Sequence, residues 1–340
     1  MDLEGDLERD LALPDLAVRT IGGGVVWAND ELFAGRENLV NPGPAVFTPR
    51  TFGAKGQVYD GWETRRRRAH HEGTNDEAIV RLGAPGVVRA VVVDTSHFTG
   101  NFPAEASLEA LCTDGHPSVG ELRAATWTPL VGRSPLRGDT ANAFAVHSDR
   151  RWTHVRLSIY PDGGVARLRV HGEAVPDPAV VEALGTVDLA ALDLGGRVTG
   201  CSNLFYGSPD RLIAPGLARS MGEGWETARR RDDGNDWVEV RLAARGVVRV
   251  AELDTTWFLG NAPGEAALSA RDGEAGGWAD LLARTPLQPD TRHRFVLDGA
   301  APATDVRLDV YPDGGMARLR LWGSPTDDGL ADLRERWARA

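Results

Sequence analysis

Cysteine is nearly absent from this chain of 340 residues, which contains only Cys112 and Cys201. A disulfide framework needs several cysteines, and in a repeated chain it would recur at matching positions, which these two do not occupy. We therefore expect two free thiols, a reducing compartment and a cytoplasmic location. No apolar run approaches the roughly 18 residues of a membrane helix. The N-terminal stretch also lacks the basic start and apolar core of a secretory signal.

Positive charge is also scarce, because 38 Lys and Arg face 49 Asp and Glu and the formal net charge is −11. Nucleic-acid binders usually carry a basic surface, so we expect neither a nucleic-acid partner nor a membrane partner. The common metal and phosphate motifs are missing too: the sequence has no HExxH, CxxC, EF-hand loop, GxSxG or P-loop. We therefore predict no essential bound metal and no cofactor, although stimulation by a divalent ion stays open.

The sequence does contain an internal repeat. Residues 75–108 align without gaps on 235–268, with 19 of 34 positions identical, and residues 154–172 align on 305–323, with 13 of 19 identical. The tetrapeptide GWET also occurs twice, at 61–64 and 224–227. A repeat of this kind indicates two copies of one domain.

The offset between the matched blocks shrinks along the chain, so the first copy carries extra residues. The larger insertions fall in 36–61 and 109–134, which are rich in Gly, Pro, Asn and Thr and are interpreted as surface loops. The predicted organisation is an N-terminal segment, a first repeat, a linker, a second repeat and a helical tail, with the boundaries 1–19, 20–172, 173–194, 195–323 and 324–340.

Strand patterns dominate both copies. Apolar and polar residues alternate through 155–160, the turn sequence PDGG follows, and alternation resumes through 166–170, which predicts a β-hairpin with one buried face. The stretch 86–94 is apolar enough for a strand buried on both faces. Helical periodicity is weak inside the copies. We therefore predict an all-β protein of two tandem jelly-roll or sandwich domains.

Two polar blocks are kept between the copies, and residues kept in diverging duplicates mark fold or function. The first block places Glu63 and Glu226 after a tryptophan, and the second places Asn101 and Asn261 after a glycine. Each glutamate can bind a urea-like NH₂ group or cap a loop backbone. Each asparagine can bind a ligand or stabilise a turn. The tryptophans, Trp62 and Trp225, are expected in the core or anchoring a loop.

The second block also contains the clearest difference between the copies. Asp94 and Asp254 both end a strand, where Asp commonly accepts backbone N–H bonds of the next turn. Three residues later the first copy has His97 and the second has Trp257. An imidazole exchanges protons near neutral pH, so His97 is a candidate for proton transfer, with a surface or structural histidine as the alternative.

The motifs DGWETRR, NDWVxVRL, DTxxFxGNxPxE, RTPLQPDTRHRF and YPDGGxARLR together resemble the allantoicase family, over nearly the whole chain. The resemblance implies two jelly-roll, galactose-binding-like domains. It also implies a hydrolase of carbon–nitrogen bonds in linear amidines, which converts allantoate to ureidoglycolate and urea in purine degradation. Two departures from the family pattern are Glu77 where a Trp is usual and Ala262 where an aromatic residue is usual.

Allantoate carries one carboxylate and two ureido groups, which suggests roles for the kept residues. Arg65 or Arg66 would bind the carboxylate, because guanidinium groups match carboxylates bidentately. The ureido groups would be held by Glu63 and Asn101, with Glu226 and Asn261 contributing from the second copy. Proton transfer would fall to His97, oriented by Asp94, with Glu63 as a further catalytic carboxylate.

Two alternatives stay open at this point. In the first, the second copy holds the site while the first copy is structural. In the second, the chain is a non-catalytic module that binds carbohydrate or another ligand, since fold alone does not separate a binder from an enzyme. We also expect a homo-oligomer, whose size the sequence does not define.

Overall fold

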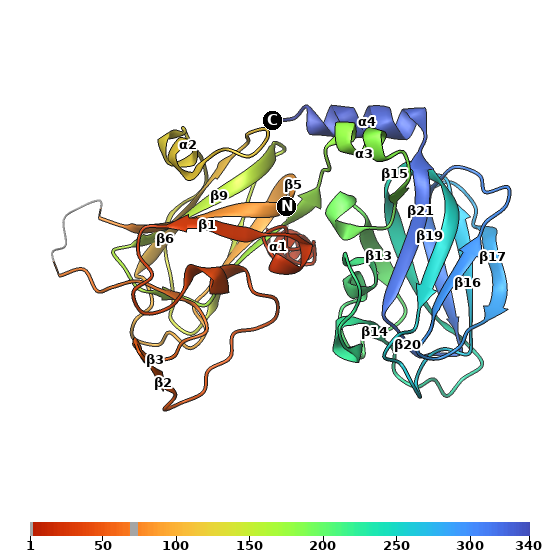
Figure 1. Cartoon of the computed structure of the whole chain (residues 1–340), viewed down its shortest axis with the longest axis horizontal. Coiled ribbons are helices and arrows are strands. Elements are labelled where there is room, and N and C mark those ends of the chain that lie inside the picture. Colours follow the sequence, from red (N-terminus) through yellow and green to blue (C-terminus); the bar gives the residue numbers. More distant parts are fainter. Residues whose placement is uncertain (1–2, 69–73) are drawn as a thin grey trace. The chain divides into compact units, whose positions relative to one another are not determined.

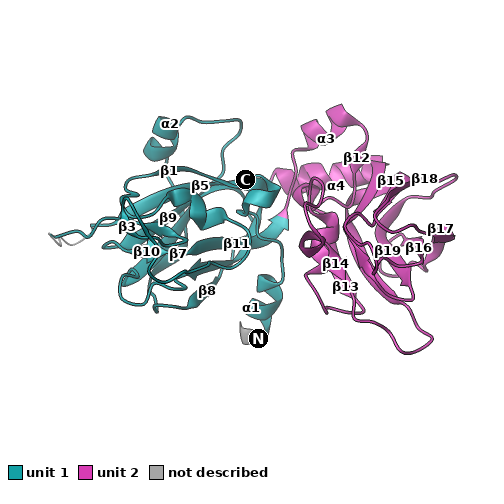
Figure 2. Cartoon of the chain, turned by 60° about the horizontal axis from the view of Figure 1, so that its bottom comes forward, with its two compact units in different colours: residues 1–173, 339–340 teal, residues 174–338 magenta. Residues whose placement is uncertain are grey.

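The computed structural model describes residues 3–68 and 74–340. It divides into two compact units, residues 1–173 with 339–340 and residues 174–338, coloured separately in Figure 2. Strands dominate both units, and the prediction of two tandem all-β sandwich domains is confirmed (Figure 1).

The first unit is organised around one long strand, β5 (Asp76–Asp94). Its first half lies between β1 and β9, and the sheet continues through β6 to β7. Its later residues pair with β8 and β11, so the same strand serves both layers of the sandwich. The partner strands are β1 (Gly24–Ala28), β6 (Glu105–Leu111), β7 (Thr128–Pro135), β8 (Ala141–Ala145), β9 (Arg151–Tyr160) and β11 (Arg167–Ala174).

The second unit repeats this plan around β15 (Asp236–Asp254). One half of β15 lies between β13 and β19, and the other half lies between β18 and β21. The remaining strands are β12 (Val187–Asp188), β13 (Arg197–Cys201), β16 (Glu265–Arg271), β17 (Ala279–Pro286), β18 (Arg292–Val296), β19 (Ala303–Tyr311) and β21 (Arg318–Pro325).

The predicted hairpin around the PDGG turn is wrong. Both of its strands exist, as β9 and β11, but neither pairs with the other, and each pairs with β5 instead. The turn carries the chain from one layer of the sandwich to the other. Alternation of apolar and polar residues shows that a segment is a strand, but it does not say which strand lies beside it.

Short elements connect the layers and frame the loops. The helices are α1 (Leu3–Leu11), α2 (Val119–Ala124), α3 (Pro178–Leu184) and α4 (Asp327–Trp337). Besides β12, the two-residue strands are β2 (Phe52–Gly53), β3 (Gly56–Gln57), β4 (Trp62–Glu63), β10 (Gly164–Val165), β14 (Trp225–Glu226) and β20 (Gly315–Met316). The insertion 36–61 contains β2 and β3, and α2 lies within the insertion 109–134, so neither insertion is only loop.

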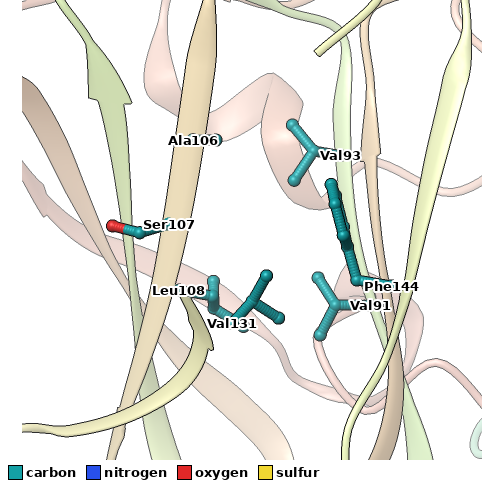
Figure 3. A pocket seen from close by; sticks show the side chains of 7 residues that line it. All are labelled: Val91, Val93, Ala106, Ser107, Leu108, Val131 and Phe144. Atoms are coloured by element: carbon teal, nitrogen blue, oxygen red, sulfur yellow. The ribbon is translucent and has the colours of Figure 1, made fainter. Parts of the chain in front are cut away.

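Apolar side chains fill the space between the layers of the first unit. Figure 3 shows side chains of β5 and β8 facing side chains of β6 and β7, while the Ser107 hydroxyl points away, where its oxygen lies 3.0 Å from the hydroxyl of Tyr160. The facing residues leave a gap too small for a water molecule and are Val91, Val93, Phe144, Ala106, Leu108 and Val131. This close packing makes the sandwich a rigid support for the loops at its ends.

Candidate functional site

The kept glutamate and asparagine meet in each unit. In the first unit, Asn101 Nδ2 donates a hydrogen bond of 2.7 Å to Glu63 Oε1. In the second unit, Asn261 Nδ2 donates one of 2.6 Å to Glu226 Oε1. The sequence put these residues forward separately, and the structure joins them into a Glu–Asn pair.

The local backbone explains how the first pair is assembled. Glu63 in β4 lies between the backbone of Ala34 and that of Gly164. Gly164 N donates a bond of 2.7 Å to Asn101 O, which brings the asparagine loop beside β4. A Cβ on Gly164 would overlap the ring of Phe98, so only glycine permits this approach.

Trp62 anchors β4 directly before Glu63. Its side chain is fully buried, and its Nε1–H donates a bond of 2.7 Å to Asp30 O. Trp225 does the same to Asn203 O at 3.0 Å in the second unit. The prediction that both tryptophans are core or loop-anchoring residues is confirmed.

The Glu63 carboxyl is electrostatically unusual. Burial raises its pKa above the ordinary value, and the hydrogen bond from Asn101 offsets only part of that effect. Within the described part of the chain, hydrogen bonding engages only its Oε1. A partly buried carboxyl that holds a proton more tightly than usual is suited to general acid and base chemistry.

In the arginine run after β4, some side chains form ion pairs with described residues and others do not. Arg65 Nε lies 2.5 Å from Asp30 Oδ2, and Arg67 Nη2 lies 2.5 Å from the buried Asp76. Arg66 and Arg68 are exposed and have no ion-pair partner among residues 3–68 and 74–340. Arg66 therefore matches a ligand-binding guanidinium better than Arg65 does. The second unit has Ala228 and Arg229 at the corresponding positions.

Asp94 closes a turn. Its Oδ1 accepts bonds from Ser96 N at 2.8 Å and Ser96 Oγ at 2.6 Å. Asp254 makes the matching bond to Thr256 N at 2.8 Å and is fully buried. The predicted turn role of Asp254 is confirmed, and Asp94 makes the same kind of bond. A catalytic role of Asp94 stays a prediction. No hydrogen bond joins Asp94 to His97 in the described residues, so its predicted orienting role is not seen as a contact.

His97 is exposed and contacts the first insertion. Its Nε2 lies 3.2 Å from Ala45 O, and its ring stacks on Phe47 at a centroid distance of 5.7 Å. Because a carbonyl only accepts, Nε2 carries the hydrogen and Nδ1 is the nitrogen available for proton transfer. Proton transfer by His97 stays a prediction.

A buried arginine that the sequence analysis missed supports the start of β4. Arg167 Nη2 lies 2.6 Å from Asp60 Oδ2, and Arg167 Nη1 donates to Asp60 O at 3.0 Å. Burial alone would raise the pKa of Asp60, but the hydrogen bonds and charge of Arg167 hold it below its ordinary value. The available signal was the repeated ARLR sequence, which places Arg318 at the same point of the second unit.

Arg318 binds the matching segment of the second unit through backbone carbonyls and not through a side-chain carboxylate. It donates to Glu223 O at 2.7 Å and to Gly216 O at 3.1 Å. Burial, with the nearby charge of Arg320, lowers its pKa to about 10. In the second unit, the chain before the Glu–Asn pair is therefore held through backbone carbonyls.

A hollow of about 290 Å³ is lined in part by Ala34, the backbone partner of Glu63, although neither Glu63 nor Asn101 lines it. Its lining combines the strand neighbour of Glu63 with the β2–β3 hairpin of the first insertion. The lining residues are Phe33, Ala34, Gly35, Gly53, Ala54, Lys55, Gly56, Gln57, Val58 and Tyr59. Sequence patterns did not predict this hollow, because it depends on how the insertion folds back.

No group of three potential metal ligands comes together among the described residues, and none of their helices is long and apolar enough to cross a membrane. Cys112 and Cys201 are both unpaired.

Known proteins resemble this chain over nearly its whole length. The family model of the allantoicase repeat matches twice, at residues 14–175 and 187–326. A protein of Nocardia farcinica described as a probable allantoicase is 60% identical over 92% of this chain and 94% of its own. The allantoicase of Dictyostelium discoideum is 39% identical over 88% of this chain and 84% of its own.

A solved structure has the same fold. The crystal structure of allantoicase from Saccharomyces cerevisiae superposes with a TM-score of 0.80 at 30% identity, covering 95% of this chain and 98% of that one. Both matches of the family model together span most of the sequence. The chain therefore belongs to the allantoicase family.

Proposed function

We propose that this protein hydrolyses allantoate to ureidoglycolate and urea, as a hydrolase of carbon–nitrogen bonds in a linear amidine. The observation that carries the proposal is the Glu–Asn pair, formed by the same residues in both units of a chain that belongs to the allantoicase family. A carboxylate beside a carboxamide presents the acceptors and donors that a ureido group requires.

The first unit supplies the groups for one substrate molecule. Glu63 Oε2 faces the nitrogen of one ureido group, and Asn101 places its carboxamide against the same group. Arg66, exposed and without an internal ion pair, binds the substrate carboxylate. In the second unit, Glu226 and Asn261 form a second pair that binds a ureido group.

The reaction needs one proton at the leaving group and one water at the central carbon. The bond between that carbon and one ureido nitrogen breaks, the nitrogen takes a proton, and urea leaves. Water then bonds to the carbon and gives up a proton, which yields the hydroxyl of ureidoglycolate. Glu63 is the assigned proton carrier, because its raised pKa favours the protonated form that donates.

The test is release of urea from allantoate by the purified chain. Urea released in proportion to substrate consumed supports an enzyme. Saturable binding of allantoate with no urea would instead favour the alternative of a non-catalytic binding protein with the same fold. The Glu63→Gln variant separates this protein's own activity from a contaminating hydrolase.

We further propose a homo-oligomer. Four large apolar side chains in the sequence segments around Glu226 and Asn261 are more than half exposed, and exposed apolar side chains suit contact between protein copies. They are Leu204, Phe205, Leu217 and Leu259. Sedimentation velocity of the whole chain tests this, and a monomer at micromolar concentration would contradict it.

A cytoplasmic location is proposed from the two unpaired thiols, because a reducing compartment keeps cysteines free. Fractionation of the producing cells is the measurement, and recovery of the protein outside the cytoplasm would contradict it.

A further inference from the structure

His97 and Trp257 share an uncommon backbone conformation. Their φ angles are +69° and +74°, in the left-handed region that non-glycine residues seldom adopt. In each unit, an aspartate accepts the backbone N–H of this residue: Asp139 accepts from His97 at 2.7 Å, and Asp290 accepts from Trp257 at 2.8 Å. The two turns are the same structure with different side chains.

The side chains also make the same kind of bond. His97 Nε2–H donates to Ala45 O at 3.2 Å, and Trp257 Nε1–H donates to Ala218 O at 2.9 Å. In each case, a ring N–H reaches a backbone carbonyl of the segment that precedes the GWET block. Although one unit has histidine and the other tryptophan, both therefore keep a ring N–H donor and a backbone carbonyl acceptor.

In the first unit, the target segment is residues 44–59, which belongs to the longer of the two versions of this loop. Aromatic residues of this segment form a series of stacked rings that starts at His97. Phe47 stacks on His97 and on Tyr59, with ring centroids 5.7 and 5.2 Å apart, and Tyr59 stacks on the buried Phe98 at 4.9 Å. The row of rings connects the outer loop to the sandwich core.

The same segment contributes to the hollow that reaches Ala34. Residues 53–59 line the hollow together with Phe33 and Ala34. Ala34 is the backbone partner of Glu63. A segment that moves away from Phe98 and His97 would open this hollow.

We propose that His97 is a positioning residue that fastens segment 44–59 and thereby shapes the substrate site. Its contribution is the Nε2–H bond to Ala45 and the stack on Phe47. The Nε2–H persists when the imidazole gains a proton, so fastening needs no proton transfer. The claim that His97 holds segment 44–59 depends only on these contacts, whereas its effect on substrate binding rests on the proposed function.

The rate of trypsin cleavage within segment 44–59 tests the contact with His97 in the absence of substrate. Segment 44–59 contains two exposed cleavage sites, Arg50 and Lys55. Cleavage needs the segment to open, and losing one hydrogen bond and its ring contact should speed cleavage there by about two- to tenfold. We expect this in His97→Ala, with protection restored in His97→Trp, the variant that copies the second unit.

The second unit provides the matched control. Trp257→Ala should speed cleavage after Arg219, beside Ala218, and leave Arg50 and Lys55 unchanged. Mass spectrometry of the fragments identifies the cleaved bonds. Unchanged cleavage at Arg50 and Lys55 in a folded His97→Ala protein would overturn the fastening, and His97→Gln, which keeps an N–H donor, tests the bond apart from the ring.

Kinetics then separate fastening from proton transfer. If His97 acts by holding segment 44–59, His97→Ala should raise KM about fivefold and leave kcat within about twofold, because uniform binding is lost. The His97→Trp variant should then behave like the natural protein, with an unchanged pH–rate profile. A His97→Trp protein that is protected from trypsin yet loses about 100-fold or more in kcat would overturn the proposal in favour of proton transfer. An unchanged KM in His97→Ala would overturn the link to substrate. Absence of urea release by the natural protein would count against the proposed function alone.

Discussion

Asn101 and Glu63 lie 38 residues apart in the sequence, and a hydrogen bond of 2.7 Å joins their side chains. Asn261 and Glu226 repeat the relationship across 35 residues at 2.6 Å. Two such pairs in one chain allow a role to be tested by comparison, because a substitution in one unit has a counterpart in the other.

The first prediction compares the two glutamates. Glu63→Gln should lower kcat by about 100-fold or more, since it removes the proton that the side chain carries. Glu226→Gln should chiefly raise KM. Urea-release kinetics and thermal melting of both variants provide the measurement. A Glu226→Gln protein with the larger loss of kcat would place the chemistry in the second unit.

The second prediction concerns the arginine run. Arg66→Ala should raise KM by about 10- to 100-fold, the effect of losing a charged hydrogen-bonding partner. Arg65→Ala should leave KM nearly unchanged and cost less than about 1 kcal/mol of stability, because its ion pair with Asp30 is largely exposed on the arginine side. Steady-state kinetics with a urea melt of each variant distinguish them. A large rise in KM for Arg65→Ala alone would reverse the assignment.

The third prediction concerns the two turn aspartates. Asp94→Ala and Asp254→Ala should each destabilise the protein by about 1–3 kcal/mol, because each leaves a turn N–H without its acceptor. Chemical denaturation followed by circular dichroism measures this. If Asp94→Ala instead loses activity at unchanged stability, Asp94 belongs to the chemistry after all.

The fourth prediction is a pH dependence of stability. Burial, with the charge of Arg81, lowers the pKa of His154 from 6.5 to about 4. The folded protein thus resists protonation that the unfolded chain accepts, so stability should fall as the pH drops from 6.5 towards 4. At 1.36 kcal/mol per pKa unit, the limit is about 3 kcal/mol.

A His154→Gln variant should lack that loss. Urea denaturation of both proteins at pH 7, 5.5 and 4 gives the two stability curves, with His171→Gln as a control at a partly exposed position. Parallel curves for the natural protein and His154→Gln would show that another group governs the acid response.

The sequence predicted the repeat, the β class and several turn residues, because these depend on local patterns. Asp94 before a turn and Trp62 in the core are examples, since each follows from residue type and its neighbours. Strand partners were not accessible in this way. The segments before and after the PDGG turn both alternate as strands, yet each pairs with β5, because a period of two is the same whichever strand lies alongside.

The site was predicted as residues and not as contacts. Glu63 and Asn101 were both candidates, but their meeting depends on Gly164 passing close to Phe98. The shared role of the rings at 97 and 257 was also missed, because histidine and tryptophan look dissimilar until both are seen to donate a ring N–H to a carbonyl. Similar chemistry can thus be kept by unlike residues.

The long strand β5 determines where the first unit tolerates a break in its backbone. Because its two halves belong to different layers, new termini between Gly83 and Gly86 would divide the one segment that both layers share. Among the described residues, β2 and β3 pair only with each other, and the residues at the tip of their hairpin are exposed. A circular permutant opened at that tip keeps both layers intact, whereas one opened inside β5 does not.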